Sequence, residues 1–279
     1  MGWFRPCRGI KFIVMLKREL GPARVPVIGQ GTWRLRGPEA VDALRTGIEL
    51  GLTHIDTAEL YGTEEMVAEA IEGQRDEIFL VSKVLPSNAT RKGTVAACEQ
   101  SLQRLRTDRL DCYLLHWPGP HPPEDTLAAF EELQTAGKIR CYGVSNFDEE
   151  LFAEAARIAG PGRIACNQVL YNLGERHVEA RVLPACREFG AVLVGYSPFD
   201  NLPEGGELAA VAAELHATRR QVALAFLVRL PGTFAIPKAS TVEHVRENAG
   251  GASVKLTERQ IARLERAYPV HVRSELPTS

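Results

Sequence analysis

The sequence has no apolar run that could cross a membrane and no clear excess of charge of either sign. A bilayer span needs about 20 consecutive apolar residues, whereas the N-terminal apolar run covers only 12–16 and has no convincing signal-peptide cleavage site after it. The 33 Lys and Arg residues against 35 Asp and Glu residues give a net charge of −2, without the basic excess of a nucleic-acid binder. We therefore expect neither a membrane nor a nucleic-acid partner.

Metal-binding and disulfide patterns are missing as well. The chain has no C-x-x-C pair and no H-E-x-x-H motif, so we expect no metal site. Six cysteines in a chain of this length are ordinary usage, and Cys112 and Cys141 lie within apolar runs, where a reduced cysteine packs as a small hydrophobic residue. This usage indicates a reduced, cytoplasmic protein, which we expect to be a monomer.

What the sequence does contain is an alternation of short apolar runs with longer amphipathic stretches. Continuous apolar runs are typical of parallel strands buried on both faces, and their alternation with helical patterns indicates βαβ units. Eight such units predict an α/β fold, a (β/α)₈ TIM barrel, which takes about 250 residues as one domain. The predicted strands lie at 27–33, 53–58, 78–84, 110–117, 139–146, 164–171, 191–199 and 233–240, and the clearest helical patterns at 39–51, 94–106, 125–137 and 182–190.

Two additions to the barrel are predicted near the ends of the chain. Apolar stretches on both sides of residues 21–24 predict an N-terminal β-hairpin. Capping-box patterns that begin at Thr218 and Thr257 predict extra helices toward the C-terminus. Because residues 1–11 show no periodicity, we divide the chain into an N-terminal extension of unknown role at 1–11 and one barrel domain at 12–279.

Polar side chains stand at the ends of the second to eighth predicted strands. In a TIM barrel, the carboxyl ends of the strands and the loops after them carry the chemistry. A polar group that ends seven strands in succession is hard to attribute to chance. The candidate site residues selected in this way are Asp56, Lys83, His116, Ser145, Asn146, Gln168, Tyr196, Ser197, Lys238 and Ser240.

Seven short motifs give these residues a common context: 53-THIDTAELYG, 80-LVSKV, 114-LLHWP, 143-GVSNF, 167-NQVLYN, 195-GYSPF and 236-IPKAS. Each motif is weak alone, but the ordered set over residues 20–268 resembles the aldo-keto reductase superfamily, and in particular bacterial members that reduce methylglyoxal and diketo acids. The resemblance implies a (β/α)₈ barrel with an N-terminal hairpin. It also implies reduction of aldehydes and ketones to alcohols with NADPH, or with NADH in some members.

The family's four catalytic residues match Asp56, Tyr61, Lys83 and His116, and their chemistry suits carbonyl reduction. Hydride transfer leaves negative charge on the carbonyl oxygen, which a tyrosine with a pKa near 10 can protonate with help from a neighbouring ammonium. Asp56 would fix Lys83, and His116 would orient the substrate oxygen or relay the proton. Each residue has an ordinary structural explanation by itself, but their joint arrangement favours catalysis.

The resemblance also assigns a coenzyme site across the barrel, in place of the Rossmann fingerprint G-x-G-x-x-G, which the sequence lacks. Amide and hydroxyl side chains would hold the nicotinamide carboxamide, Tyr196 would stack on its ring, and Lys238 with Ser240 would bind the 2′-phosphate of NADPH. The predicted coenzyme residues are Thr32, Trp33, Ser145, Asn146, Gln168, Tyr196, Ser197, Phe199, Lys238, Ser240, His244, Glu247 and Asn248.

His244 departs from many NADP-preferring members, which have an arginine there. A neutral imidazole lacks the guanidinium fork that would clamp a phosphate, so we expect NADPH as the coenzyme with NADH as a possible substitute. The substrate is expected to lie among Trp33, Tyr61, His116 and Trp117, with Tyr171 and Phe199 as further candidates. The short C-terminal tail predicts an open site of broad specificity.

Two alternative functions remain open at this point. Some members of the family serve as nicotinamide-binding, redox-sensing regulatory subunits with little turnover, and co-purification with a membrane partner would favour that function. A barrel lyase would instead use Lys83 to form a Schiff base with its substrate. In that case, Asp56 and Tyr61 would have no clear purpose.

Overall fold

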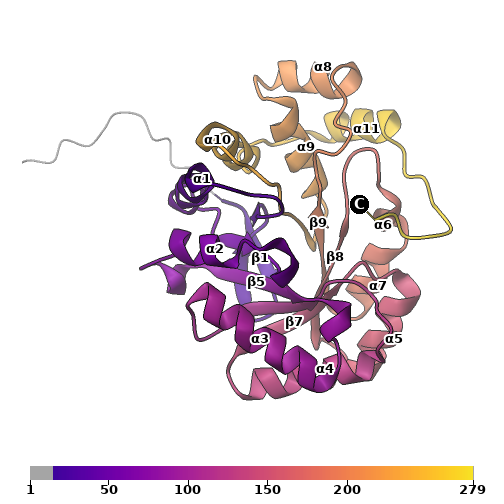
Figure 1. Cartoon of the computed structure of the whole chain (residues 1–279). Coiled ribbons are helices and arrows are strands. Elements are labelled where there is room, and N and C mark those ends of the chain that lie inside the picture. The colour runs from indigo at the N-terminus through magenta and orange to yellow at the C-terminus, as the bar shows by residue number, and fades with distance from the viewer. Residues whose placement is uncertain (1–14, 279) are drawn as a thin grey trace, which may run out of the picture.

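The computed structural model describes residues 15–278, so the predicted extension at 1–11 lies outside the described residues. Eight parallel strands pair in chain order to form one sheet around a central axis (Figure 1). Bridges from Ile28 to Ala235 and from Gly31 to Lys238 join the last strand to the first and close the barrel. The strands are β3 (Gln30–Gly31), β4 (His54–Asp56), β5 (Phe79–Val84), β6 (Leu110–Leu115), β7 (Ile139–Ser145), β8 (Ile164–Leu170), β9 (Val192–Tyr196) and β10 (Thr233–Ala235).

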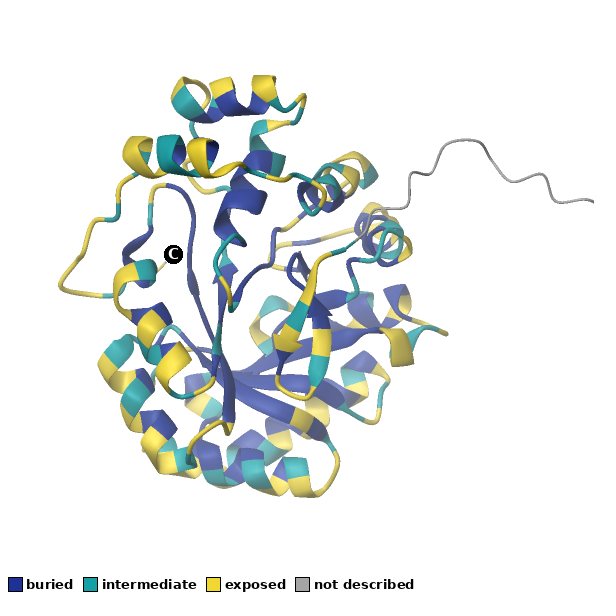
Figure 2. Ribbon diagram, turned by 180° about the vertical axis from the view of Figure 1, so that it is seen from behind, coloured by how far each residue is buried: buried dark blue, intermediate teal, exposed yellow. Residues whose placement is uncertain are grey.

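Burial explains why the strands form where the apolar runs stand. Every residue of β5, β6 and β8 is buried, as expected for strands that face the barrel interior on one side and the helices on the other. Figure 2 shows this buried interior surrounded by helices whose outer faces are exposed. Each of the eight predicted runs contains one strand, so the predicted TIM barrel is confirmed.

Helices follow the strands and cover the outside of the barrel (Figure 1). They are α1 (Pro38–Glu49), α2 (Glu64–Ala70), α3 (Arg91–Leu105), α4 (Pro123–Thr135), α5 (Glu149–Ala159), α6 (His177–Ala180), α7 (Val182–Glu188), α8 (Gly206–Glu214), α9 (Arg219–Leu227), α10 (Val242–Gly251) and α11 (Glu258–Ala267), with 3₁₀ turns η1 (Glu59–Tyr61), η2 (Arg75–Glu77) and η3 (Pro86–Asn88). Both predicted capping boxes are present, at Thr218 and Thr257. No helix within residues 15–278 is long and apolar enough to span a bilayer.

The predicted hairpin is also confirmed, as β1 (Lys17–Leu20) and β2 (Ala23–Pro26). Its turn packs against the barrel near the amino ends of β7 and β8. A Cβ atom on Gly21 would lie 2.7 Å from Cys141 Sγ and 3.5 Å from Ala165 Cβ, and the backbone there has a left-handed φ of +55°. Only glycine satisfies both conditions, so this turn fits closely against the amino ends of β7 and β8.

The barrel interior near the hairpin is apolar and contains cysteines and a neutral histidine. Cys112, Cys141 and Cys166 are buried there, and all five cysteines within the described residues are free thiols. Burial lowers the pKa of His54 to about 4, with nearby Asp56 opposing the shift and Lys83 adding to it. His54 is therefore uncharged at neutral pH.

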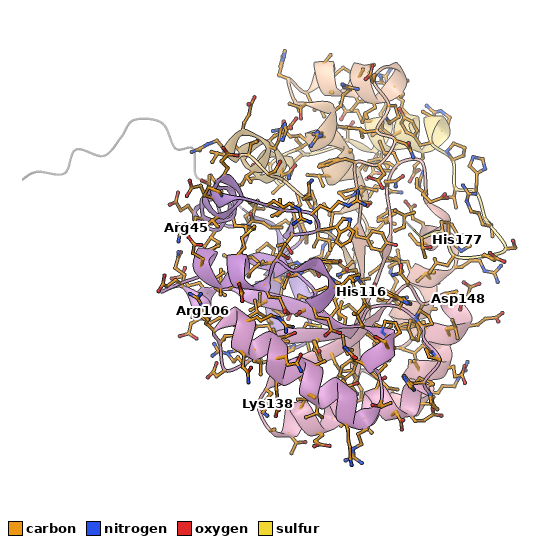
Figure 3. All side chains as sticks on the ribbon, viewed as in Figure 1. Arg45, Arg106, His116, Lys138, Asp148 and His177 are labelled. Carbon is orange, nitrogen blue, oxygen red and sulfur yellow. The ribbon has the colours of Figure 1, made fainter. Side chains whose placement is uncertain are left out.

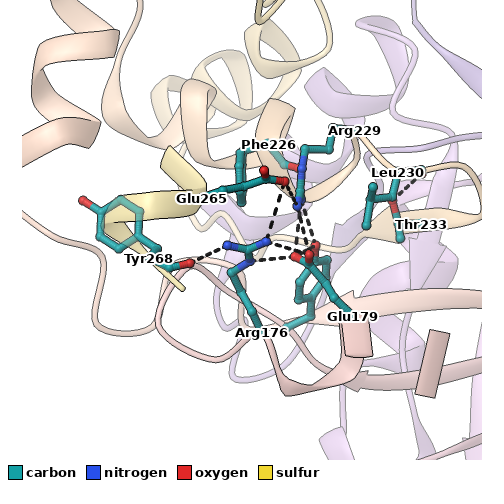
Figure 4. A network of polar contacts seen from close by, with 9 residues as sticks. Arg176, Glu179, Phe226, Arg229, Leu230, Thr233, Glu265 and Tyr268 are labelled. Carbon is teal, nitrogen blue, oxygen red and sulfur yellow. Dashed lines mark hydrogen bonds and ion pairs between the residues drawn. The ribbon is translucent and has the colours of Figure 1, made fainter. Parts of the chain in front are cut away.

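Two buried arginines, Arg176 and Arg229, connect the last helix to the barrel (Figure 4). Arg229 on the loop after α9 and Arg176 beside α6 both contact the Glu179 carboxylate, at 2.9 and 2.7 Å. Arg176 also donates to the carbonyl of Tyr268, directly after α11. These contacts secure α11, the predicted extra C-terminal helix, and the tail then returns to α6 (Figure 1).

Candidate active site

At the carboxyl ends of the strands, which we call the barrel mouth, a buried ion pair joins β4 to β5. Lys83 Nζ lies 2.5 Å from Asp56 Oδ1, and it also donates to the carbonyl oxygen of Thr57 at 2.8 Å. The Lys83 side chain is fully buried and that of Asp56 is 2% exposed. Because buried charges are stable only when paired and hydrogen-bonded, the two residues hold each other in place.

Lys83 remains protonated in this setting. Burial by itself would lower its pKa, but the negative charge of Asp56 and the contact with Tyr61 outweigh burial and raise the pKa above 10.5. A lysine that forms Schiff bases needs the opposite shift, toward a neutral amine. The buried ion pair with Asp56, which favours the charged ammonium, therefore argues against the lyase alternative.

Tyr61 reaches this ion pair from η1, five residues after Asp56. Its hydroxyl lies 3.4 Å from Lys83 Nζ and 3.3 Å from His116 Nε2. Burial raises the pKa of Tyr61, and the positive charge of Lys83 opposes that shift. The hydroxyl thus keeps its proton at neutral pH and stands between a fixed cation and an imidazole.

His116 follows β6 and lies near the centre of the molecule in Figure 3. Burial, together with the positive charge of Lys83, lowers its pKa to about 3. The imidazole is therefore neutral, with Nε2 toward Tyr61 and a buried Nδ1 that has no hydrogen-bond partner in the described part of the chain. The four predicted catalytic residues are thus brought together in one connected cluster.

The four residues predicted at the nicotinamide end are also brought together, through contacts with one another. Tyr196 donates its hydroxyl proton to Asn146 Oδ1 at 2.8 Å, and Asn146 Nδ2 donates to the His116 carbonyl at 3.1 Å. Ser145 donates to the carbonyl oxygen of Gln168. The Gln168 amide Nε2 donates to Asp56 Oδ2 at 2.7 Å, a contact that links this group directly to the Lys83 ion pair.

The residues predicted near the coenzyme phosphates lie apart from this cluster. Lys238 and Ser240 follow β10, His244 lies in the first turn of α10, and all three are exposed. Asn248, further along α10, is buried, and its Oδ1 has no partner among residues 15–278. Three further members of the predicted set contact neighbouring residues. Glu247 is 3.9 Å from Arg220, whose guanidinium lies over the Phe199 ring. The backbone carbonyl of Ser197 accepts a hydrogen bond from Asn172 Nδ2.

The predicted aromatic residues divide into two groups. Trp33 is 45% exposed and packs 4.8 Å from the Tyr61 ring, and Trp117 is 37% exposed and packs 4.7 Å from the His116 ring. Tyr171 is instead fully buried, with its hydroxyl donating to Glu179, so it forms part of the core and not of the mouth. Phe199 is partly buried against the core.

Some residues at the site were not predicted, or have contacts that the sequence did not suggest. Thr32 is fully buried and donates to the Asp56 carbonyl, and its hydroxyl also contacts Thr63. Glu59 accepts hydrogen bonds from the loop that follows Lys83. Thr32 was predicted only as a coenzyme residue, and the only sequence signal for Glu59 and Thr63 was their position beside Tyr61. Within residues 15–278, no three His, Cys, Asp or Glu side chains are arranged to hold a metal ion.

The comparisons with known proteins agree with this architecture. The model of the aldo/keto reductase family matches residues 27–269. The chain is 46% identical over 268 residues to methylglyoxal reductase YeaE of Escherichia coli, covering 89% of this chain and 93% of that one, and 32% identical over 251 residues to glyoxal reductase of Bacillus subtilis, covering 86% and 88%. The crystal structure of an aldo/keto reductase from Klebsiella pneumoniae in complex with NADP and acetate superposes with a TM-score of 0.90 at 41% identity, covering 95% of this chain and all of that one.

A barrel of this kind, with a polar cluster at its mouth and relatives of this similarity, defines an oxidoreductase. The chain belongs to the aldo/keto reductase family.

Proposed function

We propose that the protein reduces small aldehydes and ketones to alcohols with NADPH, with Tyr61 as the general acid. The observation that carries this proposal is the continuous contact from Asp56 through Lys83 and Tyr61 to His116 at the mouth. One proton donor, one fixed cation and one neutral imidazole are the groups that a developing alkoxide requires. The coenzyme, when bound, supplies the hydride.

Each residue of the cluster has a distinct task in this mechanism. Tyr61 donates its proton to the carbonyl oxygen, and Lys83 stabilises the phenolate that forms, because its charge stands 3.4 Å from the hydroxyl oxygen. Asp56 keeps Lys83 charged and in place. His116 is neutral, so its Nε2–H can donate to the substrate oxygen and orient it toward Tyr61.

The chain's own residues fit a nicotinamide dinucleotide phosphate. Ser145, Asn146 and Gln168 present hydroxyl and amide groups to a carboxamide, and Tyr196 presents an aromatic face beside them. The buried, unpartnered Oδ1 of Asn248 is an acceptor that suits the amino group of an adenine. Lys238 and Ser240, with Thr241 capping the amino end of α10, form a cationic and hydroxyl-rich site for the 2′-phosphate.

The exposed rings of Trp33 and Trp117, on either side of Tyr61 and His116, supply apolar surface for the substrate. They impose few directional contacts, which supports acceptance of varied aldehydes and ketones. Methylglyoxal is the first substrate to test, because the relatives named above include a methylglyoxal reductase and a glyoxal reductase.

The test is oxidation of NADPH and NADH, followed at 340 nm with methylglyoxal, glyoxal, aromatic aldehydes and simple ketones. We expect turnover with several of these carbonyls and a higher kcat/KM for NADPH than for NADH. Tight NADPH binding without turnover on the whole panel would contradict the proposal and favour the redox-sensing subunit.

A further inference from the structure

The turn that carries Tyr61 is held on one side by a carboxylate. Glu59 is the first residue of η1, and its Oε1 accepts a hydrogen bond from the backbone N–H of Leu85, two residues after Lys83. The same carboxylate accepts from Asn88 Nδ2, with N–O distances of 3.2 and 3.4 Å. Glu59 is half-buried, so these contacts are partly shielded from water.

On its other side, the turn is held by a chain of hydroxyl groups. Thr63 Oγ1 lies 2.9 Å from Thr57 Oγ1 and 3.0 Å from Thr32 Oγ1, and Thr32 donates to the Asp56 carbonyl at 3.0 Å. All three threonines are buried. Between these supports, Gly62 ends η1 in the left-handed region at φ +64°, where an L side chain is strained.

We propose that Glu59 is a positioning residue for the reaction: its carboxylate joins the Tyr61 turn to the backbone beyond Lys83 and thereby sets the distance between the Tyr61 hydroxyl and the Lys83 ammonium. This inference rests on the proposed function of Tyr61 as general acid. Glu59 precedes Tyr61 by two residues and its partner Leu85 follows Lys83 by two, so this link spans the same gap as the 3.4 Å contact between the two catalytic side chains.

Geometry, and not charge, is the means by which Glu59 acts. Its carboxylate oxygens bind a backbone N–H and an amide, and neither contacts Lys83 Nζ, whose partners are Asp56, Thr57 and Tyr61. A neutral glutamine therefore retains an acceptor for the Leu85 N–H, whereas alanine leaves that N–H and Asn88 without their partner. A misplacement of about 1 Å in an active site can cost about 100-fold in rate.

The experiment compares Glu59→Ala and Glu59→Gln with Glu65→Ala, an exposed control on α2. We expect Glu59→Ala to lower kcat with saturating NADPH and methylglyoxal by about 10- to 100-fold, with KM for NADPH unchanged. Glu59→Gln and Glu65→Ala should stay within about threefold of wild type, and the pH profile should keep its shape in all three. Asn88→Ala, which removes only one of the two donors, should lower kcat less than Glu59→Ala, and thermal unfolding of each variant establishes that it is folded.

A second measurement separates this inference from the proposed function. Single-turnover rates are measured for Tyr61→Phe with and without Glu59→Ala, where a residue that acts through Tyr61 adds little further loss. Normal turnover in Tyr61→Phe would overturn the proposed function. If Tyr61→Phe is inactive but folded Glu59→Ala has a normal kcat, or if the two losses multiply, the positioning role of Glu59 is wrong.

Discussion

The two ends of the barrel mouth are built in different ways. At the end with Asp56, Lys83 and Tyr61, buried side chains bind one another directly, and nearly every polar group has a partner within the protein. At the end with Lys238 and His244, the side chains are exposed and none of the ion pairs among the described residues includes them. The first end is already assembled in the protein alone, whereas the second presents separate groups to solvent.

This difference fits the separate roles that the proposed function gives to the two ends. The proposed reaction requires groups that need no rearrangement when charge develops, which accounts for a cluster of Asp56, Lys83 and Tyr61 that is assembled without any ligand. A phosphate site can instead hold its cations apart in water, because the ligand itself brings the compensating charge. We therefore expect substitutions at the first end to lower kcat and stability, and substitutions at the second to change coenzyme affinity alone.

The largest effect is expected from Tyr61→Phe, which removes the proton donor and retains the ring that packs against Trp33 and His116. Loss of one general acid should lower kcat by about 10²- to 10⁴-fold. Steady-state kinetics with methylglyoxal measure kcat, and fluorescence titration measures the affinity for NADPH. Turnover within twofold of wild type would rule out Tyr61 as the acid.

Lys83→Met should abolish activity and also destabilise the protein. Removal of one partner of a buried ion pair costs about 3–5 kcal/mol, because the Asp56 carboxylate would be left buried and uncompensated. Asp56→Asn should lower activity less than Lys83→Met, because Asp56 supports the cation and does not contact Tyr61. Urea unfolding and kinetics of both variants test this order, and a greater loss of activity in folded Asp56→Asn would reverse the assigned roles.

Lys238→Ala should raise KM for NADPH by about 10- to 150-fold, because a hydrogen bond to a charged group contributes about 1.5–3 kcal/mol. KM for NADH should change little, since NADH has no 2′-phosphate. The free energy of unfolding should not change, because Lys238 is exposed. Equal losses for the two coenzymes would mean that Lys238 does not bind the 2′-phosphate.

Mild acid should destabilise the protein through its buried histidines. The pKa of His116 is lowered to about 3 and that of His54 to about 4, so below an unfolded-state pKa of about 6.5 the unfolded chain binds more protons than the folded one. The contribution of these two histidines to the free energy of unfolding is therefore fully present above about pH 6.5. It decreases as the pH falls toward 4, by about 2 kcal/mol for each histidine between pH 7 and pH 5. Urea unfolding at both pH values should show this loss, and His54→Phe should reduce it whereas the exposed control His271→Gln should not.

The smallest effect is expected from His244→Arg at the phosphate end. A guanidinium adds a permanent charge and a planar pair of donors, so NADPH should bind a few-fold more tightly, by about 1 kcal/mol, while NADH binding stays the same. Coenzyme titrations of both proteins measure the change. Weaker NADPH binding in the variant would indicate that His244 does not face the phosphate.

The fold could be predicted from the sequence because its signals are local. Strands β5, β6 and β8 are apolar runs buried on both faces, and Thr218 and Thr257 cap the helices that their spacing predicts. The grouping of Asp56, Lys83 and His116 followed from barrel geometry, which brings all strand ends to one mouth. Predicting Tyr61 required the family resemblance.

The contacts that connect different loops could not be predicted. Gln168 donates to Asp56 across 112 residues of sequence, and Glu59 accepts from the Leu85 backbone. Such contacts depend on the register between neighbouring strands and on side-chain rotamers, neither of which a single residue type reveals. Tyr171 was expected near the substrate, but its place in the core depends on Glu179, a partner on a separate helix.

The most direct test of the difference between the two ends is a comparison of Tyr61→Phe, Lys238→Ala and the double variant. The NADPH dissociation constant is measured by fluorescence and the single-turnover rate by stopped flow. Tyr61→Phe should change only the rate, and Lys238→Ala should change only the dissociation constant. In the double variant, each quantity should change by the same factor as in the corresponding single variant, because the two sites share no contacts. If either single variant changes both quantities by the same factor, the two ends of the mouth do not act separately.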